Sequence, residues 1–485
     1  MEKPRLRPGT VATLAISLVG VFLIQCWGIA TPSLWADEIA TISAASRPLS
    51  ALWVLLQKID MVHGTYYLFM HFWVQAFGFN PFWLRLPSAL AITATSAVIW
   101  LIAKKVTGER LAWWALAIAT FMPRLSWAAT EGRSYAFSAL VGALICLFFI
   151  DAFVLNHSGR SKLWIAYGLA LGLGINLFVY VILLALTHGL WLRLSQRVIP
   201  RRWWWGLFTG LGIGLFVTVW AGIEHGQVAW LPKVSIRTIG EILVGQNFLG
   251  SDTVALLATG LIIALALGAR RQSTTVLEDR MIQLWTLCAV LPPAVVVGYS
   301  LLGSSIYDSR YFTFATPMVV LLLALALDKL MPRLVGWISL VLILALFLLP
   351  YFDFRGIQGK PTNWAQVAKV VAQKTKPGDT ILYADFGERS PSVSRISLGY
   401  PRAFQGLQDI TRNSTKHSVA GLYPERKPLS EVLKKLVGSK RVWLLSNRIK
   451  DAAQVTQVTE LLAGVGFLKS KQTPIGAEDL YEFVR

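Results

Sequence analysis

The chain has 485 residues, of which 55% are hydrophobic and only 15% are charged, and its mean hydropathy is +0.55. This composition excludes an ordinary soluble domain and indicates a polytopic membrane protein that lies in a lipid bilayer. The formal net charge of +20 does not indicate nucleic-acid binding. The basic residues stand in short clusters between apolar runs, which is typical of cytoplasmic loops in membrane proteins.

Eleven apolar runs are candidates for transmembrane helices, because a bilayer core about 30 Å thick is crossed by roughly twenty helical residues. We place them at 11–30, 84–103, 111–129, 133–154, 163–175, 177–192, 203–223, 252–269, 281–302, 312–328 and 334–351. The first run follows a basic tail and lacks a clear cleavage site, so we interpret it as a retained span rather than a signal peptide.

Basic residues between these runs orient the chain in the membrane. They fall at even crossings, which puts them and the N-terminus in the cytoplasm. These residues are Lys104, Lys105 and Arg110; Arg160 and Lys162; Arg193, Arg197, Arg201 and Arg202; Arg270, Arg271 and Arg280; and Lys329 and Arg333. Counting the apolar segment 64–79 as a span would invert every later loop. We therefore expect interfacial helices within one external segment, 31–83.

The composition changes after the last span. Residues 1–353 are expected to form the transmembrane domain, and the odd number of spans puts residues 354–485 outside the cytoplasm as an α/β domain. There the pattern predicts helices at 363–375, 429–438 and 452–466, and strands at 380–385, 441–447 and 479–484. The fold class is thus a multi-pass α-helical protein of the plasma membrane with a C-terminal extracytoplasmic domain.

An acidic pair, Asp37 and Glu38, follows the first span in the external segment. One interpretation is an exposed helix start, where carboxylates are favourable. The other is a general base that removes the proton of an acceptor hydroxyl, which requires a carboxylate in a partly desolvated cavity. Adjacent side chains point in different directions on a regular backbone, so the second carboxylate would orient or tune the first.

Two arginines stand in other external turns. Arg133 lies between Glu131 and Tyr135, and Arg310 lies between Asp308 and Tyr311. They could extend to the lipid headgroups, or they could bind a lipid-linked phosphate, since the planar donors of guanidinium match phosphate oxygens. His63 is either a neutral interfacial histidine or a further donor to phosphate or sugar.

No cofactor is expected. The cysteines Cys26, Cys146 and Cys288 lie in apolar runs without the spacing of a metal site or a disulfide framework. The carboxylates could bind a divalent cation, but we favour a reaction without metal. We find no nucleotide-binding loop.

Five segments in a fixed order resemble those of a known group of enzymes. They are "ADE" at 36–38, "HGTYYLFMHFWVQAFG" at 63–78, "RLPSAL" at 85–90, "TEGRSYAF" at 130–137 and "SRYFTFATP" at 309–317. They resemble the protein O-mannosyltransferase and lipid A aminoarabinose transferase group of the GT-C superfamily, and most closely its bacterial mannosyltransferase-like branch. The chain departs from many relatives in having "HGT" at 63–65 in place of His-Pro-Pro.

The resemblance implies a membrane glycosyltransferase that takes a sugar, mannose by default, from a polyprenyl-phosphate donor. The acceptor would be a hydroxyl of a glycan, glycolipid or protein on the extracytoplasmic side, and the anomeric carbon would be inverted. Asp37 would be the base, with Glu38 beside it, and Arg133 and Arg310 would bind the donor phosphate.

Two other classes compete with this hypothesis. A lipid or polysaccharide flippase or transporter would show an internal repeat of spans and charges near the middle of the membrane, and the sequence has neither. A non-catalytic scaffold or receptor would leave the acidic and basic residues of the external turns without a purpose.

Overall fold

The computed structural model describes residues 8–155, 162–196, 199–223, 231–249, 251–268, 274–384, 393–413 and 421–485. The chain forms two compact units. The first, here called the helical unit, comprises Met1–Ile29, Asp60–Tyr66 and Arg85–Arg355. The second, here called the mixed unit, comprises Ala30–Ile59, Tyr67–Leu84 and Gly356–Arg485.

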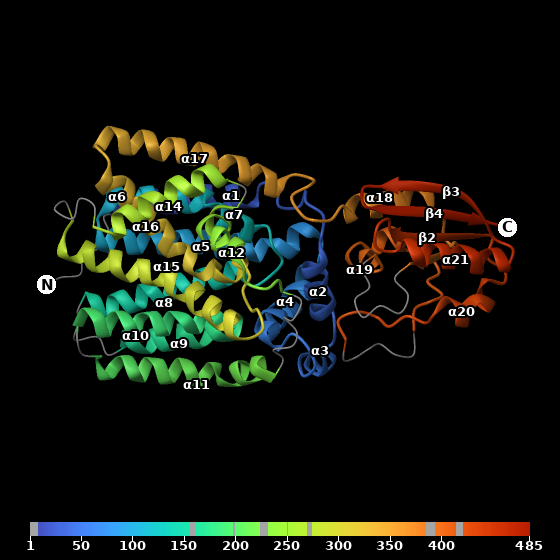
Figure 1. Cartoon of the computed structure of the whole chain (residues 1–485), viewed down its shortest axis with the longest axis horizontal. Helices are drawn as coiled ribbons and strands as arrows, with labels where there is room; N and C mark the ends of the chain where they lie inside the picture. Colours follow the sequence, from blue (N-terminus) through green and yellow to red (C-terminus); the bar gives the residue numbers. More distant parts are fainter. Residues whose placement is uncertain are drawn as a thin grey trace. The chain divides into compact units, whose positions relative to one another are not determined.

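Within the described residues, each apolar run that the sequence singled out is largely helical (Figure 1). These helices are α1 (Pro8–Cys26), α5 (Pro81–Val106), α6 (Glu109–Phe121), α7 (Pro123–Ala129), α8 (Tyr135–Phe149) with its π-helical extension η2 (Ile150–Val154), α9 (Lys162–Leu177), α10 (Ile182–Gln196), α11 (Arg201–Ile223), α14 (Asp252–Ala266), α15 (Val276–Leu302), α16 (Thr316–Leu330) and α17 (Arg333–Arg355). Of the basic loop residues, Arg160, Arg197, Arg270 and Arg271 lie outside the described residues.

Seven helices of the described chain are long and apolar enough to cross a membrane, and the number rises to eight if a bent pair counts as one span. That pair joins Ile236–Phe248, which contains α12 (Ile236–Gly240), η5 (Glu241–Gly245) and α13 (Gln246–Phe248), to α14. The prediction of a polytopic helical membrane protein is therefore confirmed. The helices α9 and α10 are apolar but shorter.

The run 111–129 is interrupted where one continuous helix was expected. Met122 has an extended conformation, with φ −51° and ψ 118°, and Pro123 starts α7. Proline has no N–H to donate and disfavours helical geometry in the residue before it. The break separates α7 from α6, and α7 ends at Ala129, just before the turn that contains Glu131 and Arg133.

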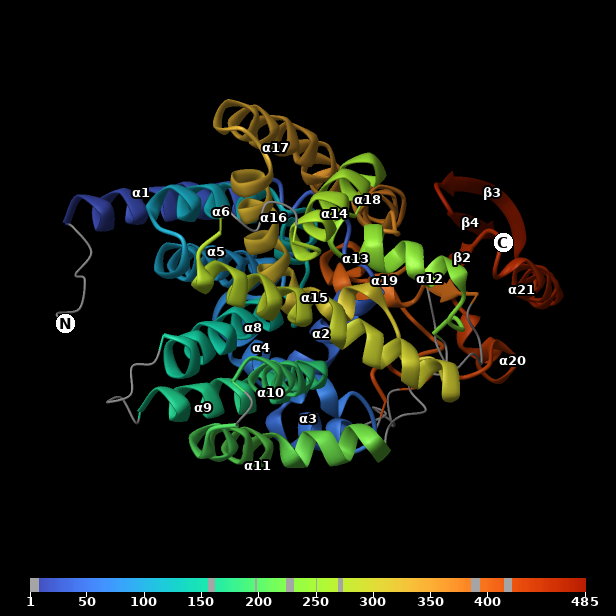
Figure 2. The same cartoon turned by 60° about the vertical axis from the view of Figure 1, so that its left-hand side comes forward.

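Glycines allow α9 and α11 to pack closely. The two helices run side by side in both views (Figures 1 and 2). A Cβ atom added at Gly210 would lie 2.7 Å from Leu171 Cδ2, and one added at Gly172 would lie 2.6 Å from Ile213 Cβ. Small residues at a spacing of four are typical of close helix pairs in membranes.

The C-terminal part of the mixed unit is a four-stranded sheet with the order β1-β2-β4-β3. Its strands are β1 (Thr380–Tyr383), β2 (Arg441–Asn447), β3 (Leu468–Ile475) and β4 (Glu478–Val484). The pair β1/β2 is parallel and the other two pairs are antiparallel. Leu382 pairs with Leu444, which in turn pairs with Tyr481, and all three belong to the core.

Helices accompany the sheet. They are α18 (Trp364–Lys374), α19 (Arg395–Gly399), η8 (Pro401–Phe404), α20 (Leu429–Val432), η9 (Leu433–Leu436) and α21 (Ala452–Gly464). Three of them, α20, η9 and α21, contribute residues to this core. The expected helix at 429–438 is divided into α20 and η9, and β3 was not expected. Its sequence, LKSKQTPI, is polar and mostly exposed, as suits a strand at the edge of a sheet.

The mixed unit also contains the segment that carries the acidic pair. This segment forms α2 (Ala36–Ala45) and α3 (Leu49–Leu56). The next element, η1 (Met61–His63), belongs to the helical unit and leads into α4 (Gly64–Phe77). Leu34 N–H donates to Tyr400 Oη over 2.8 Å, and Thr362 Oγ1 donates to the Leu34 carbonyl over 3.0 Å. The start of α2 is therefore anchored to residues that follow the last transmembrane helix.

Candidate functional site

Arg133 lies in the turn between α7 and α8, and its side chain is nearly buried, with 7% exposed. Glu131, two residues earlier, is completely buried. Its carbonyl oxygen accepts a hydrogen bond of 2.6 Å from Ser88 Oγ on α5. The turn is thus attached to the neighbouring helix, which limits where the guanidinium of Arg133 can go.

Arg310 is held by Asp308. The carboxylate caps the 3-10 helix η7 (Ser309–Ala315), because Oδ1 accepts from the Arg310 main-chain N–H over 3.0 Å. Oδ2 lies 3.0 Å from Arg310 Nε in an ion pair. The same side chain therefore starts the helix and orients the guanidinium.

Aromatic rings surround this arginine. The Arg310 guanidinium carbon lies 6.0 Å from the ring centre of Tyr135 and 5.8 Å from that of Tyr311. Phe178 packs between these two tyrosines, with ring centres 6.0 Å and 5.5 Å away. Tyr180 lies 5.4 Å from Tyr311 and donates through its hydroxyl to the Ile306 carbonyl over 2.6 Å. The predicted residues of two separate turns thus meet at one aromatic cluster.

His63 belongs to the same group. Its ring lies 6.5 Å from that of Phe178. Burial, followed by the positive charges of Arg133 and Arg310, holds the pKa of His63 well below its usual value. The imidazole is therefore neutral at physiological pH, and the two arginines carry the positive charge of the group.

The acidic pair lies in the mixed unit, whereas the arginines lie in the helical unit. Both carboxylates are in the first turn of α2, after Trp35, which has extended backbone and makes no side-chain cap. Glu38 is completely buried and Asp37 is half-buried. A carboxylate exposed in part is the better candidate for contact with a substrate, and this difference is consistent with the role of base that the resemblance implies for Asp37.

Arg124 was not singled out from the sequence, although it is a charged residue inside an expected span. It is 1% exposed and lies on α7. Its guanidinium donates to the carbonyls of Gln246, over 2.6 Å, and Gly245, over 2.8 Å, and to Ser309 Oγ over 3.3 Å. Arg124 thus connects α7 to the residue next to Arg310. Its position in an apolar run was the available signal.

No group of three or more His, Cys, Asp or Glu side chains is placed to hold a metal ion in the part of the chain that the structure describes. The basic and aromatic group built by His63, Arg133, Tyr135, Arg310 and Tyr311 suits an anion. Arginines with fixed orientation can bind phosphate oxygens through parallel N–H donors.

Residues 65–221 match the family described as dolichyl-phosphate-mannose-protein mannosyltransferase. No curated protein sequence matches the chain.

Several solved structures have a similar fold. ArnT from Cupriavidus metallidurans bound to undecaprenyl phosphate is 14% identical, with a TM-score of 0.60, and the match covers 98% of each chain. AglB, an oligosaccharyltransferase from Archaeoglobus fulgidus in complex with an inhibitory peptide and a dolichol-phosphate, is 12% identical, with a TM-score of 0.51 over 98% of this chain and 74% of that one. The arabinofuranosyltransferase AftD from Mycobacteria is 14% identical, with a TM-score of 0.50 over 98% and 40%.

Proposed function

We propose that this chain is a membrane glycosyltransferase of the GT-C superfamily, and that it transfers a sugar, mannose by default, from a polyprenyl-phosphate donor to a hydroxyl of an acceptor glycan, glycolipid or protein. The observation that carries the proposal is that His63 and Arg310 lie at one aromatic cluster of the helical unit, where the charges of Arg133 and Arg310 both act on His63. The undecaprenyl phosphate bound to ArnT supports the choice of donor.

The arginines act on the leaving group. As the bond between the anomeric carbon and the phosphate oxygen breaks, its electron pair moves to the phosphate, and negative charge grows there. Arg310, oriented by Asp308, and Arg133 stabilise that charge. Neutral His63 donates or accepts one hydrogen bond without adding charge. Glu131, Tyr135 and Tyr311 support the arginines.

Asp37 acts on the acceptor. Its carboxylate takes the proton of the acceptor hydroxyl while the oxygen forms the new bond to the anomeric carbon. Attack from the side opposite the phosphate inverts the configuration at that carbon. Buried Glu38 orients α2 rather than exchanging the proton. The step needs no redox partner and, in this scheme, no metal.

The orientation of the chain follows from the span count. The basic loops put the N-terminus in the cytoplasm. Eleven spans then bring residues 354–485 to the extracytoplasmic side; this count includes the seven long helices, the bent pair, the interrupted pair α6 and α7, and the short helices α9 and α10. Asp37, Arg133 and Arg310 share that side in this threading. A lipid-linked donor fits it, because the reaction needs no cytoplasmic nucleotide sugar.

The test has two parts. Mass spectrometry of envelope glycans, glycolipids and glycoproteins from cells with and without the gene is expected to reveal one sugar missing from one acceptor. Purified protein in lipid should then transfer that sugar from its polyprenyl-phosphate form, and from no nucleotide sugar. A flippase would translocate the lipid-linked sugar without forming a new glycosidic bond, and that result would overturn the proposal.

A further inference from the structure

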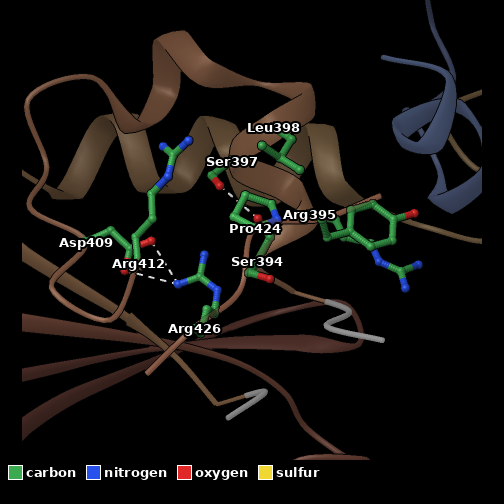
Figure 3. A pocket seen from close by; sticks show the side chains of 9 residues that line it. Ser394, Arg395, Ser397, Leu398, Asp409, Arg412, Pro424 and Arg426 are labelled. Carbon is green, nitrogen blue, oxygen red and sulfur yellow. Dashed lines mark hydrogen bonds and ion pairs between the residues drawn. The ribbon is translucent and has the colours of Figure 1, made fainter. Parts of the chain in front are cut away.

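The C-terminal part of the mixed unit contains a pocket with a volume of about 290 Å³, which includes space open to solvent (Figure 3). Three segments line it: the start of α19, the loop that contains Asp409 and Arg412, and the segment that ends at Arg426. The lining residues are Ser394, Arg395, Ser397, Leu398, Asp409, Arg412, Tyr423, Pro424 and Arg426.

The charged lining is strongly positive, with three arginines and one aspartate. Asp409 is already engaged by Arg426, whose Nη1 lies 3.0 Å from Oδ1 and 2.8 Å from Oδ2 (Figure 3). The Arg426 guanidinium also lies 4.3 Å from the ring centre of Tyr383 in β1. Arg426 is thus held by both the carboxylate and the ring. Because Asp409 is paired with Arg426, this single carboxylate has little capacity to neutralise another arginine.

Arg412 is the arginine that remains available. It is exposed, and no hydrogen bond or ion pair of its guanidinium occurs with the residues that the structure describes. Its backbone is nevertheless fixed, because the chain forms a short antiparallel bridge between Arg412 and Arg426. Lys427 N–H donates to the Thr411 carbonyl over 2.8 Å on one side of it, and Asn413 N–H to the Glu425 carbonyl over 3.1 Å on the other.

Arg395 stands on the other wall of the pocket, with its guanidinium carbon 4.3 Å from the ring centre of Tyr423. A stacked guanidinium keeps its orientation. Two serines on the same wall add hydroxyl groups, and Ser397 Oγ is directed by its donation to the Ser394 carbonyl over 2.8 Å. Arginine, hydroxyl and aromatic groups together suit an anionic sugar better than an apolar ligand.

The pocket is joined to the helix that carries Asp37. Arg47, which follows α2, donates through Nη2 to the Gly421 carbonyl over 2.5 Å, and Ser43 of α2 donates to the Leu422 carbonyl. Tyr423, the next residue, lines the pocket. Gly399 at the end of α19 lies directly against Ile39 of α2. One compact unit therefore contains both the pocket and the proposed base.

We propose that this pocket binds an anionic group, a phosphate or a carboxylate, carried by the acceptor glycan. The anionic character of the ligand is inferred from the pocket alone. Its identification as part of the acceptor glycan rests on the proposed function. Binding at the pocket would attach the acceptor to the same unit as Asp37. The acceptor hydroxyl and its base would then move together, which reduces the entropy lost on alignment.

Three probes with one sugar ring separate the possibilities: glucose 6-phosphate, glucuronate and glucose. Saturation-transfer difference NMR on the full chain in lipid nanodiscs reports weak binding of each. We expect a saturation-transfer signal from one or both anionic probes and no signal from glucose. Binding of glucose 6-phosphate alone assigns a phosphate, and binding of glucuronate alone assigns a carboxylate. Equal signals from all three probes, or from none, would overturn the proposal.

Variants locate the binding. Arg412→Gln should weaken the affinity for the anionic probe about tenfold, because one charge-assisted interaction is lost, and Arg412→Lys should recover part of it. Arg402→Gln removes an exposed arginine of η8 in the same unit that does not line the pocket, and should leave the affinity unchanged. Equal affinity of Arg412→Gln and wild type would place the anion elsewhere and refute the proposal.

The NMR readout does not depend on catalysis, so the two proposals can fail separately. Asp37→Asn should bind the probe as the wild type does and lose sugar transfer. If Asp37→Asn binds the probe and still transfers sugar, the assignment of the base is wrong and the pocket stands. If wild type transfers sugar but binds neither anionic probe, the pocket proposal is wrong and the enzyme assignment stands.

Discussion

Arg310 is oriented before any donor binds, because Asp308 contacts both its main-chain N–H and its Nε. Replacing Arg310 by glutamine keeps a polar side chain but removes the positive charge. We expect Arg310→Gln to raise the KM for the polyprenyl-phosphate donor about 10- to 100-fold, the range for loss of one charged hydrogen bond. Arg133→Gln should act in the same direction.

Donor kinetics of purified protein in lipid measure this effect. Arg237→Gln is the matched control, since Arg237 is exposed on α12. A donor KM that is the same in Arg310→Gln, Arg133→Gln and wild type would remove both arginines from the phosphate site.

Asp37 differs from Glu38 in its exposure, although the two are neighbours on α2. Asp37→Asn has nearly the same shape but no basic oxygen, so transfer should fall at least about 100-fold, with normal amounts of folded protein. Asp353→Asn, at an exposed position near the end of α17, should transfer sugar normally. Near wild-type transfer by Asp37→Asn would show that another group is the base.

His63 provides a prediction about pH. Burial and the two arginines lower its pKa, so the neutral form persists as the pH falls through the usual titration range of histidine, about 6.5. Between about pH 8 and about pH 6, His63 should therefore cause no change in the donor KM, and His63→Gln should give the same profile as wild type. A wild-type KM that falls with pH, with a flat profile in the variant, would show that His63 becomes charged.

At the scale of elements, the close contact between α9 and α11 depends on glycines, which have no side chain to separate the helices. A Cβ at Gly210 would be 2.7 Å from Leu171 Cδ2, whereas one at Gly212, on the same helix, meets nothing within 4 Å. We expect Gly210→Val to destabilise the protein by about 2 kcal/mol through overpacking, and Gly212→Val to have little effect. Thermal unfolding in detergent compares the two variants. Equal melting temperatures of the two variants would show that close packing of α9 against α11 does not contribute to stability.

The elements also differ in how far local sequence determines them. Apolar runs predicted the helices of the helical unit, because a long stretch without charge satisfies its backbone only as a helix in lipid. The strand β3 was missed because its residues are polar, and it exists through its pairing with β4. The break at Met122–Pro123 was overlooked although proline is a local signal.

At the scale of the whole molecule, the proposed orientation can be tested directly. Alkaline phosphatase is active only outside the cytoplasm. Fused after Arg485 it should be active, and fused after Leu330, between α16 and α17, it should be inactive. The reason is that α17 is the last span and reverses the side of the chain. The opposite pattern of activity would invert the threading and move the proposed site to the cytoplasmic face.

The sequence by itself determined the membrane class, the positions of the helices and the identity of Asp37, Arg133, Arg310 and His63 as candidates. These conclusions depend on composition and local pattern, which need no knowledge of distant contacts. Only the tertiary structure decided which candidates meet. It brought His63 and Arg310 to a cluster that contains Phe178 and Tyr180, which no motif had marked, and it put Arg133 near enough for its charge to act on His63. Packing joins these residues although they are far apart in the chain.

The tertiary structure also decided that α2 belongs to the same unit as the C-terminal sheet. The hydrogen bonds from Leu34, Ser43 and Arg47 to residues beyond the last span produce this arrangement. No local pattern could predict them, because a main-chain carbonyl accepts from any donor that the fold brings near. The sequence thus identified the chemical groups, and packing determined which of them can act together.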